Sequence, residues 1–180
     1  EFMRDCELIR YKADLSAYIG KLVYINFVDN ATGDYGLIFC DEFKTYYANE
    51  ADLLPGHNVA VNKVDSIYNV MNGGFETGDL TGWTLEGQKI GKVTNASGWW
   101  NENLPYNKKG AYLFSGIVDE AEGVLEHHKG TLTSSAFIVG GSGYITYLLG
   151  GGGNPLECYI SIIDAETGEE LARYANRLFN

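Results

Sequence analysis

Side chains that could bind a sugar gather between residues 97 and 107. Trp99 and Trp100 are adjacent in a stretch with no alternation of apolar and polar residues. A loop is therefore predicted, because two adjacent large rings cannot both belong to the core of one strand. Sugars stack their C–H faces on such rings and pair their hydroxyl groups with nearby polar side chains. The residues predicted to bind carbohydrate are Trp99, Trp100, Asn101 and Tyr106. The alternative is that one tryptophan closes the end of the fold.

Three further polar residues are candidates for the same ligand site. Asp119 and Glu120 lie in an acidic stretch and could contact sugar hydroxyls, although such carboxylates more often simply face solvent. Asn154 follows a run of glycines, residues 150–153, whose missing side chains could let a ligand approach the backbone. The competing explanation for this glycine run is a strained hairpin.

A metal ion could bind beside Glu76. This carboxylate belongs to residues 72–83, Asn-Gly-Gly-Phe-Glu-Thr-Gly-Asp-Leu-Thr-Gly-Trp, whose glycines favour sharp turns and whose Phe75 and Trp83 are expected to be buried. Carboxylate and backbone carbonyl oxygens are the ligands that Ca²⁺ prefers. The alternative is a carboxylate that accepts hydrogen bonds from backbone N–H groups in a turn. Asp79 is a weaker metal candidate in the same stretch.

Motifs for catalysis do not occur in the sequence. The histidines are His57, His127 and His128, and there is no nucleophile elbow, HExxH zinc motif or phosphate-binding loop. Neighbouring acidic residues such as Glu169 and Glu170 are expected by chance in a chain with 24 Asp and Glu residues. We therefore expect a protein that is not an enzyme.

The charge and the cysteine content limit which partners, metal sites and disulfides can be expected. The net charge of −11, from 24 acidic and 13 basic residues, argues against binding to nucleic acid or to an anionic membrane. No apolar run is long enough to span a membrane. The cysteines Cys6, Cys40 and Cys158 show no metal-ligand spacing and are expected to be small buried residues rather than disulfide partners.

Short β-strands dominate the expected structure. Runs rich in β-branched and aromatic residues, separated by turns of Gly, Asn and Asp, are typical of strands. Such strands at regular spacing predict an all-β sandwich of two antiparallel sheets. The strands are expected at residues 8–11, 22–29, 35–43, 83–86, 90–93, 110–116, 130–139, 143–149, 158–164 and 170–174, and a long turn at residues 150–155.

Several of these stretches resemble one kind of module. Residues 72–83 are similar to the opening strand of the jelly-roll modules appended to secreted bacterial glycoside hydrolases, and residues 10–43 resemble their closing strands. Together with residues 95–100, 130–155 and 158–176, they resemble the β-sandwich modules found beside fructan-degrading enzymes of glycoside hydrolase family 32. In such modules the glutamate that matches Glu76 often shares a structural calcium ion with a carboxylate of the closing strand; Asp41 matches that position.

The resembling pieces occur in inverted order. Residues 1–47 are similar to the closing strands of a module and residues 72–180 to its opening strands, with residues 48–71 as a linker. Either piece alone would have open sheet edges or too small a core. We therefore predict that they complete one jelly-roll sandwich in circularly permuted order, within a monomer or by strand exchange in a swapped dimer. Two separate domains are a third possibility.

The resemblance implies a non-catalytic carbohydrate-binding accessory module. It would target a glycoside hydrolase to a polysaccharide, such as a fructan, outside a bacterial cell or on its surface, without insertion into a membrane. The alternative function is that of a structural spacer or adhesion module of a cell-surface protein, with no sugar binding. A hydrolase would require two carboxylates that face each other across a cleft.

Overall fold

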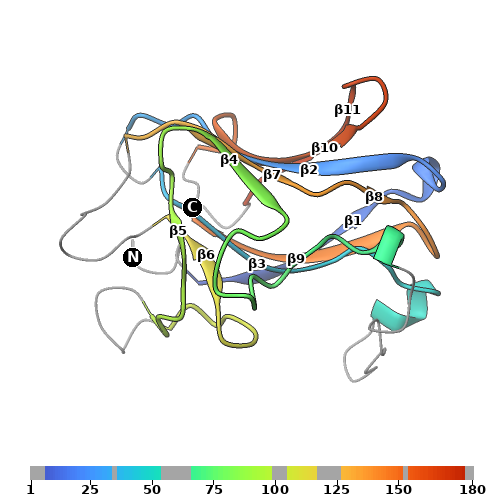
Figure 1. Ribbon diagram of the computed structural model, residues 1–180, viewed down its shortest axis with the longest axis horizontal. Helices are drawn as coiled ribbons and strands as arrows, with labels where there is room; N and C mark the ends of the chain where they lie inside the picture. Colours follow the sequence, from blue (N-terminus) through green and yellow to red (C-terminus); the bar gives the residue numbers. More distant parts are fainter. Residues whose placement is uncertain are drawn as a thin grey trace.

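The computed structural model describes residues 7–33, 36–53, 66–98, 105–116, 127–151 and 154–176. Within these residues the protein is an all-β sandwich of two antiparallel sheets, which confirms the predicted fold class (Figure 1). The described part contains no α-helix. Its helical turns are short 3-10 segments at Ser16–Tyr18, Glu50–Leu53 and Ser66–Tyr68.

The two layers of the sandwich are named sheet A and sheet B. Sheet A has the strand order β1-β9-β3-β6-β5, and sheet B has the order β11-β10-β2-β7-β4, with β8 paired to β2. The strands of sheet A are β1 (Ile9–Asp14), β3 (Ile38–Lys44), β5 (Lys92–Thr94), β6 (Leu113–Ser115) and β9 (Tyr144–Gly151). Those of sheet B are β2 (Leu22–Asp29), β4 (Trp83–Gly87), β7 (Gly130–Ser134), β8 (Phe137–Ile138), β10 (Cys158–Asp164) and β11 (Glu170–Tyr174).

Strands from both ends of the chain alternate within each sheet. β2 lies between β10 and β7, and its pairing with β10 runs from Asp29–Cys158 to Val23–Asp164. In the other sheet, β3 lies between β9 and β6, and β9 also pairs with β1. Residues 9–44 therefore supply the interior strands β2 and β3 and the edge strand β1, and the other members of both sheets come from residues 83–174.

The described residues on the two sides of residues 54–65 contact each other. Thr45 Oγ1 donates a hydrogen bond to the carbonyl of Tyr68 (2.8 Å) and accepts one from the N–H of Val70 (3.0 Å). The rings of Tyr46 and Tyr68 also pack together, with centroids 5.5 Å apart. Residues 45 and 46, which follow β3, therefore lie beside residues 68–70.

The glycine run at residues 150–153 does not form the predicted turn throughout. β9 continues through Gly150 and Gly151, which pair with Phe39 and Ile38. Gly151 has a φ of 71°, and a Cβ atom at this position would lie 2.1 Å from the carbonyl oxygen of Leu37. The glycine therefore serves a close approach of two strands as well as a change of direction. The predicted strand 130–139 is likewise divided into β7 and β8.

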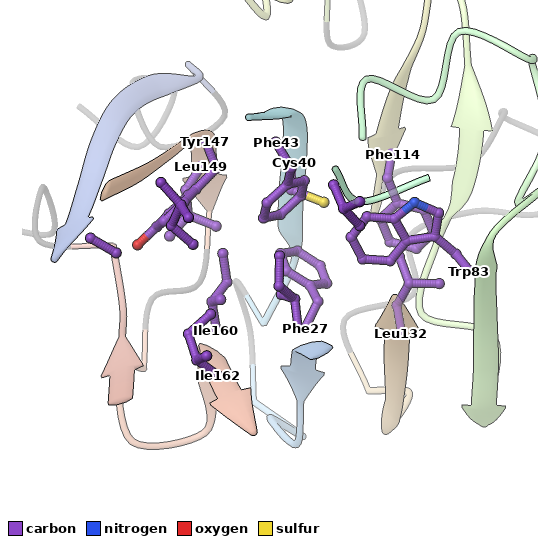
Figure 2. Close-up of a cluster of buried hydrophobic side chains, with 14 of the residues drawn as sticks. Phe27, Cys40, Phe43, Trp83, Phe114, Leu132, Tyr147, Leu149, Ile160 and Ile162 are labelled. Carbon is purple, nitrogen blue, oxygen red and sulfur yellow. The ribbon is translucent and has the colours of Figure 1, made fainter. Parts of the chain in front are cut away.

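The main core fills the space between the sheets (Figure 2). Phe75 and Trp83 are buried as expected, with ring centroids 5.2 Å apart, and Trp83 also packs on Phe43 from sheet A at 5.3 Å. Cys40 and Cys158 are buried free thiols, which confirms their interpretation as small core residues. Aromatic contacts between the layers thus fix the glycine-rich stretch 72–83 to both sheets.

Candidate functional site

The residues that the sequence predicted to bind a sugar lie in different parts of the structure. Trp99, Trp100, Asn101, Asp119 and Glu120 lie outside the described residues.

Tyr106 is a core residue of the structure. Its side chain is only 2% exposed, and its ring lies 5.5 Å from that of Phe39, centroid to centroid. Its N–H donates to the carbonyl of Ser97 (3.0 Å), and its carbonyl accepts from the N–H of Leu8 (2.9 Å). Tyr106 therefore holds its chain segment over the outer face of sheet A, and its ring is covered rather than presented to a ligand.

Asn154 organises the turn that leads into β10. Its side-chain oxygen accepts the N–H of Leu156 (3.1 Å), and its amide donates to the carboxylate of Glu157 (2.7 Å). Its carbonyl also accepts the N–H of Cys158 at 2.7 Å. The polar groups of this exposed side chain are thus engaged within the turn, as is common for Asn in such positions.

Glu76 is held by the loop that precedes β6. Its carboxylate accepts the N–H of Ala111 (3.0 and 3.1 Å to its two oxygens) and of Tyr112 (3.1 Å). Gly110 has a φ of 72°, and a Cβ at this position would lie 2.3 Å from a Glu76 oxygen. A side chain there would displace the carboxylate, so the loop requires glycine at this position.

Asp41 reaches the same loop from β3. Its Oδ2 accepts the N–H of Lys109 (2.7 Å), and its Oδ1 accepts the N–H of Glu42 (2.6 Å). Burial raises the pKa of Asp41 to about 7; the N–H of Lys109 lowers this pKa, and the nearby Glu76 raises it. The structure therefore brings the two predicted metal-ligating carboxylates to one short loop, residues 109–112.

The carboxylate oxygens of Asp41 and Glu76 satisfy part of the coordination that a calcium ion requires. Ca²⁺ takes about six to eight oxygen ligands, and Asp41 and Glu76 supply four carboxylate oxygens, so backbone carbonyls and water would have to complete the shell. The described residues contain no group of three or more His, Cys, Asp or Glu side chains that could hold a metal ion. Both carboxylates accept backbone N–H groups, which is the alternative that the sequence left open.

A row of polar side chains crosses the outer face of sheet B, which is the face that points away from the core. Arg173 on β11 pairs with Ser161 on β10, and Ser161 pairs with Asn26 on β2. Asn26 then pairs with Thr133 on β7, and Thr133 with Thr84 on β4. Paired residues of antiparallel strands point to the same face, so the five side chains lie side by side across five strands. We call them the polar row.

Burial shows that the polar row lies on the outer face. Ile25 and Phe27, on either side of Asn26, are 0% exposed in the core, whereas Asn26 itself is only half-buried. Strand residues alternate between faces, so Asn26 points away from the core. The hydroxyl of Thr133 donates to Asn26 Oδ1 at 2.9 Å. Ser161 is buried, with 2% of its surface exposed, and its hydroxyl donates to the Glu170 carboxylate at 2.8 Å.

Two tyrosines flank the polar row on opposite sides. Tyr159 precedes Ser161 by two residues on β10, and Tyr24 precedes Asn26 by two residues on β2. Because these strands are antiparallel, one tyrosine lies on each side of the row, and their Cα atoms are ~13 Å apart along the strand direction. Both tyrosines are half-buried. Each thus combines a packed position with an accessible part.

An ion pair fixes one end of the polar row. The guanidinium of Arg173 donates to the two Glu170 oxygens at 2.9 and 2.8 Å and lies 3.8 Å from the centroid of the Tyr159 ring. The hydrogen bond to Arg173 lowers the pKa of Glu170, and the same bond raises the pKa of Arg173. The pair therefore stays ionised near neutral pH and orients the ring beside it.

The outer face of sheet A is built differently. A second apolar cluster lies on it, which contains Leu8, Leu37, Phe39, Tyr106, Leu113 and Leu148. Beyond this cluster the face carries ion pairs: Glu42 contacts Arg10 and Lys44, and Lys12 lies 3.5 Å from Glu50. Apolar cover and paired charges thus take up the positions that on sheet B hold the polar row.

Sequence reasoning did not identify the polar row. A signal is present, because outward positions alternate with apolar ones in residues 22–29 and 158–164. Alternation assigns each side chain to a face of its own strand, but only the strand order β11-β10-β2-β7-β4 makes these residues neighbours. The row thus depends on pairings between residues more than a hundred positions apart in sequence.

Comparison of the chain with protein-family models, curated proteins and solved structures found no match. In the described part, no helix is long and apolar enough to cross a membrane. A functional assignment therefore has to start from the geometry of the two sheet faces and the chemistry of their side chains.

Proposed function

We propose that the protein is a non-catalytic carbohydrate-binding module and that its ligand binds the outer face of sheet B. The observation that carries this proposal is the polar row with Tyr24 and Tyr159 beside it. Hydroxyl, amide and guanidinium groups can pair with sugar hydroxyls, and tyrosine rings offer surfaces for C–H stacking. A partly exposed face of this kind, with Asn26 and Thr133 half-buried beside the two tyrosines, suits a polymer that passes over it.

Two acidic side chains of this face, Glu170 and Glu86, lie too far apart to act together as a glycosidase pair. Glu170 on β11 and Glu86 on β4 lie on the two edge strands, four strand spacings apart, or ~19 Å. Glycosidases hold their two carboxyl groups about 5 to 10 Å apart. Glu170 is also engaged by Arg173. This geometry supports a binding role for the face.

The biological setting of the proposal comes from the sequence resemblance. We propose that the module holds a secreted bacterial glycoside hydrolase near its polysaccharide, and that fructan is the first ligand to test. The resemblance of residues 72–83 and 10–43 to modules of fructan-degrading enzymes supports this choice.

The proposal is tested by glycan titration of the folded protein. Levan, inulin, xylan and cellulose oligosaccharides are titrated by calorimetry against the wild type, Tyr24→Ala and Tyr159→Ala. We expect one glycan class to bind and each variant to weaken binding about tenfold, through loss of a stacking surface. Tyr144→Ala is the matched control, because Tyr144 is a half-buried tyrosine on the outer face of sheet A and should leave binding unchanged.

Two outcomes would redirect the proposal. If a folded wild type binds none of these glycans, the structural spacer or adhesion module becomes the better assignment. If binding is lost in Trp99→Ala or Trp100→Ala but persists in Tyr24→Ala and Tyr159→Ala, the module binds sugar through the tryptophan segment. Circular dichroism of each variant confirms that it remains folded.

A structural calcium ion between Asp41 and Glu76 is a second, separable proposal. The support is their convergence on residues 109–112, where a cation would offset two adjacent negative charges. We expect Ca²⁺ to raise the melting temperature of the wild type but not of Asp41→Asn or Glu76→Gln. Asp79→Asn is the matched control, since this exposed carboxylate lies in the same glycine-rich stretch. An equal response to Ca²⁺ in all four proteins would contradict the site.

A further inference from the structure

Resting on the function proposed above, we infer that the ligand is a neutral, linear glycan that lies across the strands of sheet B rather than along them. The direction of the polar row, the positions of Tyr24 and Tyr159 and the charges of the face all point to this arrangement.

The polar row runs at right angles to the strands. It places one polar side chain on each of five neighbouring strands, from Arg173 on β11 to Thr84 on β4. Neighbouring strands are ~4.8 Å apart, so the row is ~19 Å long. This strand spacing is close to the advance of one sugar residue in an extended glycan, so about four or five sugar residues match the row.

The tyrosines border the middle of this path. Tyr159 on β10 and Tyr24 on β2 lie on adjacent strands, with their Cα atoms two residues, or ~7 Å, from the row and on opposite sides of it. A glycan in the row passes between the two rings and can touch both. A glycan that followed β2 instead would meet Tyr24 but could not reach both Arg173 and Thr84, which lie on opposite edge strands.

The charges of the face favour a neutral ligand. Arg173 already donates to both oxygens of Glu170, so its positive charge is locally balanced. Glu86, exposed on β4, adds negative charge near the other end of the row. The chain as a whole carries a net charge of −11, which repels polyanionic glycans at low salt. Pairing through hydroxyl groups, not through charge, is therefore the expected mode of recognition.

The length of the bound segment is tested with oligosaccharide series. Inulo-, cello- and xylo-oligosaccharides from disaccharide to octasaccharide are titrated into the wild type by calorimetry, with polygalacturonate as the anionic probe. In the series that binds, affinity should rise with each added sugar up to the tetra- or pentasaccharide and then level off. Affinity that is already maximal for the disaccharide, or tighter binding of polygalacturonate, would overturn the inference.

The direction of the glycan is tested at the two ends of the row. Thr84→Ala and Arg173→Ala are each expected to weaken pentasaccharide binding several-fold, and the two losses should multiply in the double variant. Thr131→Ala is the matched control, because Thr131 lies on β7 two residues from Thr133 and outside the row. A loss in Thr131→Ala with none in Thr84→Ala would indicate a glycan that runs along the strands, and the inference would be wrong.

Failure of the proposed function itself gives a different result. A folded wild type that binds no member of any series would refute the binding function and this inference together. Oligosaccharide binding that depends on Trp99 or Trp100 but not on Thr84 and Arg173 would leave the binding function standing and overturn only the path across sheet B. Circular dichroism and melting temperature are measured for every variant, so that unfolding is not mistaken for loss of binding.

Discussion

The two outer faces of the sandwich differ in how far their outward side chains are buried, although both are built from antiparallel strands. On sheet A, outward positions hold Phe39, Leu113 and Leu148, and Tyr106 covers them. On sheet B, the equivalent outward positions form the polar row, and Asn26 and Thr133 remain partly accessible. The described residues thus form a second buried apolar cluster on the outer face of sheet A, in addition to the core between the sheets. The residues at alternating positions, not the strands themselves, decide which face can meet a ligand.

Removal of the Tyr106 ring, which covers the apolar cluster on sheet A, should have the largest effect on stability. Tyr106→Ala is expected to lower the free energy of unfolding by about 3 kcal/mol, because it deletes a fully packed ring and leaves a cavity above Phe39. Tyr24→Ala, on the outer face of sheet B, should cost less than about 1 kcal/mol, since its ring is half-exposed. Urea unfolding followed by circular dichroism measures both. Equal losses would show that the two faces do not differ in packing.

Each sheet also contains a buried aspartate with a raised pKa. Burial raises the pKa of Asp29, at the end of β2, to about 7; hydrogen bonds from the Cys158 thiol (3.4 Å) and the N–H of Ala31 (3.2 Å) lower it, and the charge of Glu157 raises it. Asp41 in sheet A has a pKa of about 7 for the same main reason. The folded state therefore holds these protons more tightly than the unfolded chain does.

This difference sets the sign of a pH effect. Between about pH 4 and pH 7 these two carboxyl groups bind more protons in the folded state than in the unfolded state, so their contribution to stability is present at low pH and is lost as pH rises through the folded pKa. Asp29→Asn removes the titrating group while it keeps an acceptor for the N–H of Ala31. We expect this variant to be more stable than the wild type by roughly 2 kcal/mol at pH 8 and similar to it at pH 4. Unfolding curves at both pH values measure the change, and a variant less stable at pH 8 would contradict the assignment.

The fold could be predicted from the sequence to a large extent. Strands 22–29, 158–164 and 170–174 occur where β-branched and aromatic residues predicted them, and Phe75 and Trp83 are buried as their spacing indicated. One wrong assignment concerned Gly150 and Gly151, because glycine marks a turn and a close strand approach equally well. Local patterns thus locate strands, while contacts between strands decide the exceptions.

The candidate site was harder to predict. Aromatic side chains in a segment without alternation drew attention to Tyr106, yet that tyrosine is buried in the apolar cluster on the outer face of sheet A. Glu76 and Asp41 do converge on one loop, as their proposed shared role requires, although 35 residues separate them in sequence. The polar row could not be predicted, because its five members come from five strands whose order is set by long-range pairing. Chemistry that depends on such pairing is visible only in the folded structure.

Central residues on the two faces should separate binding from stability. Thr146 in sheet A is buried, and its hydroxyl lies 2.5 Å from that of Tyr47, so Thr146→Val should lower the free energy of unfolding by about 1 to 2 kcal/mol and leave glycan affinity unchanged. Asn26→Ala in sheet B should do the reverse, with glycan affinity about tenfold lower and a stability loss of less than about 1 kcal/mol. Calorimetry and urea unfolding on the same samples measure both. Parallel changes in the two variants would mean that neither face is specialised.

The exposed ion pairs provide the finest comparison, because they should be alike in stability and different in function. Lys12 with Glu50 on sheet A and Arg173 with Glu170 on sheet B are both largely solvent-exposed, and pairs of this kind contribute about 0 to 1 kcal/mol. Lys12→Ala and Arg173→Ala should therefore shift the melting temperature only slightly, and added salt should reduce even that shift. Only Arg173→Ala should weaken glycan binding, because Arg173 ends the polar row and lies over the Tyr159 ring. If both variants bind glycan as the wild type does, the contact surface stops short of β11, and the ligand covers fewer strands than the row.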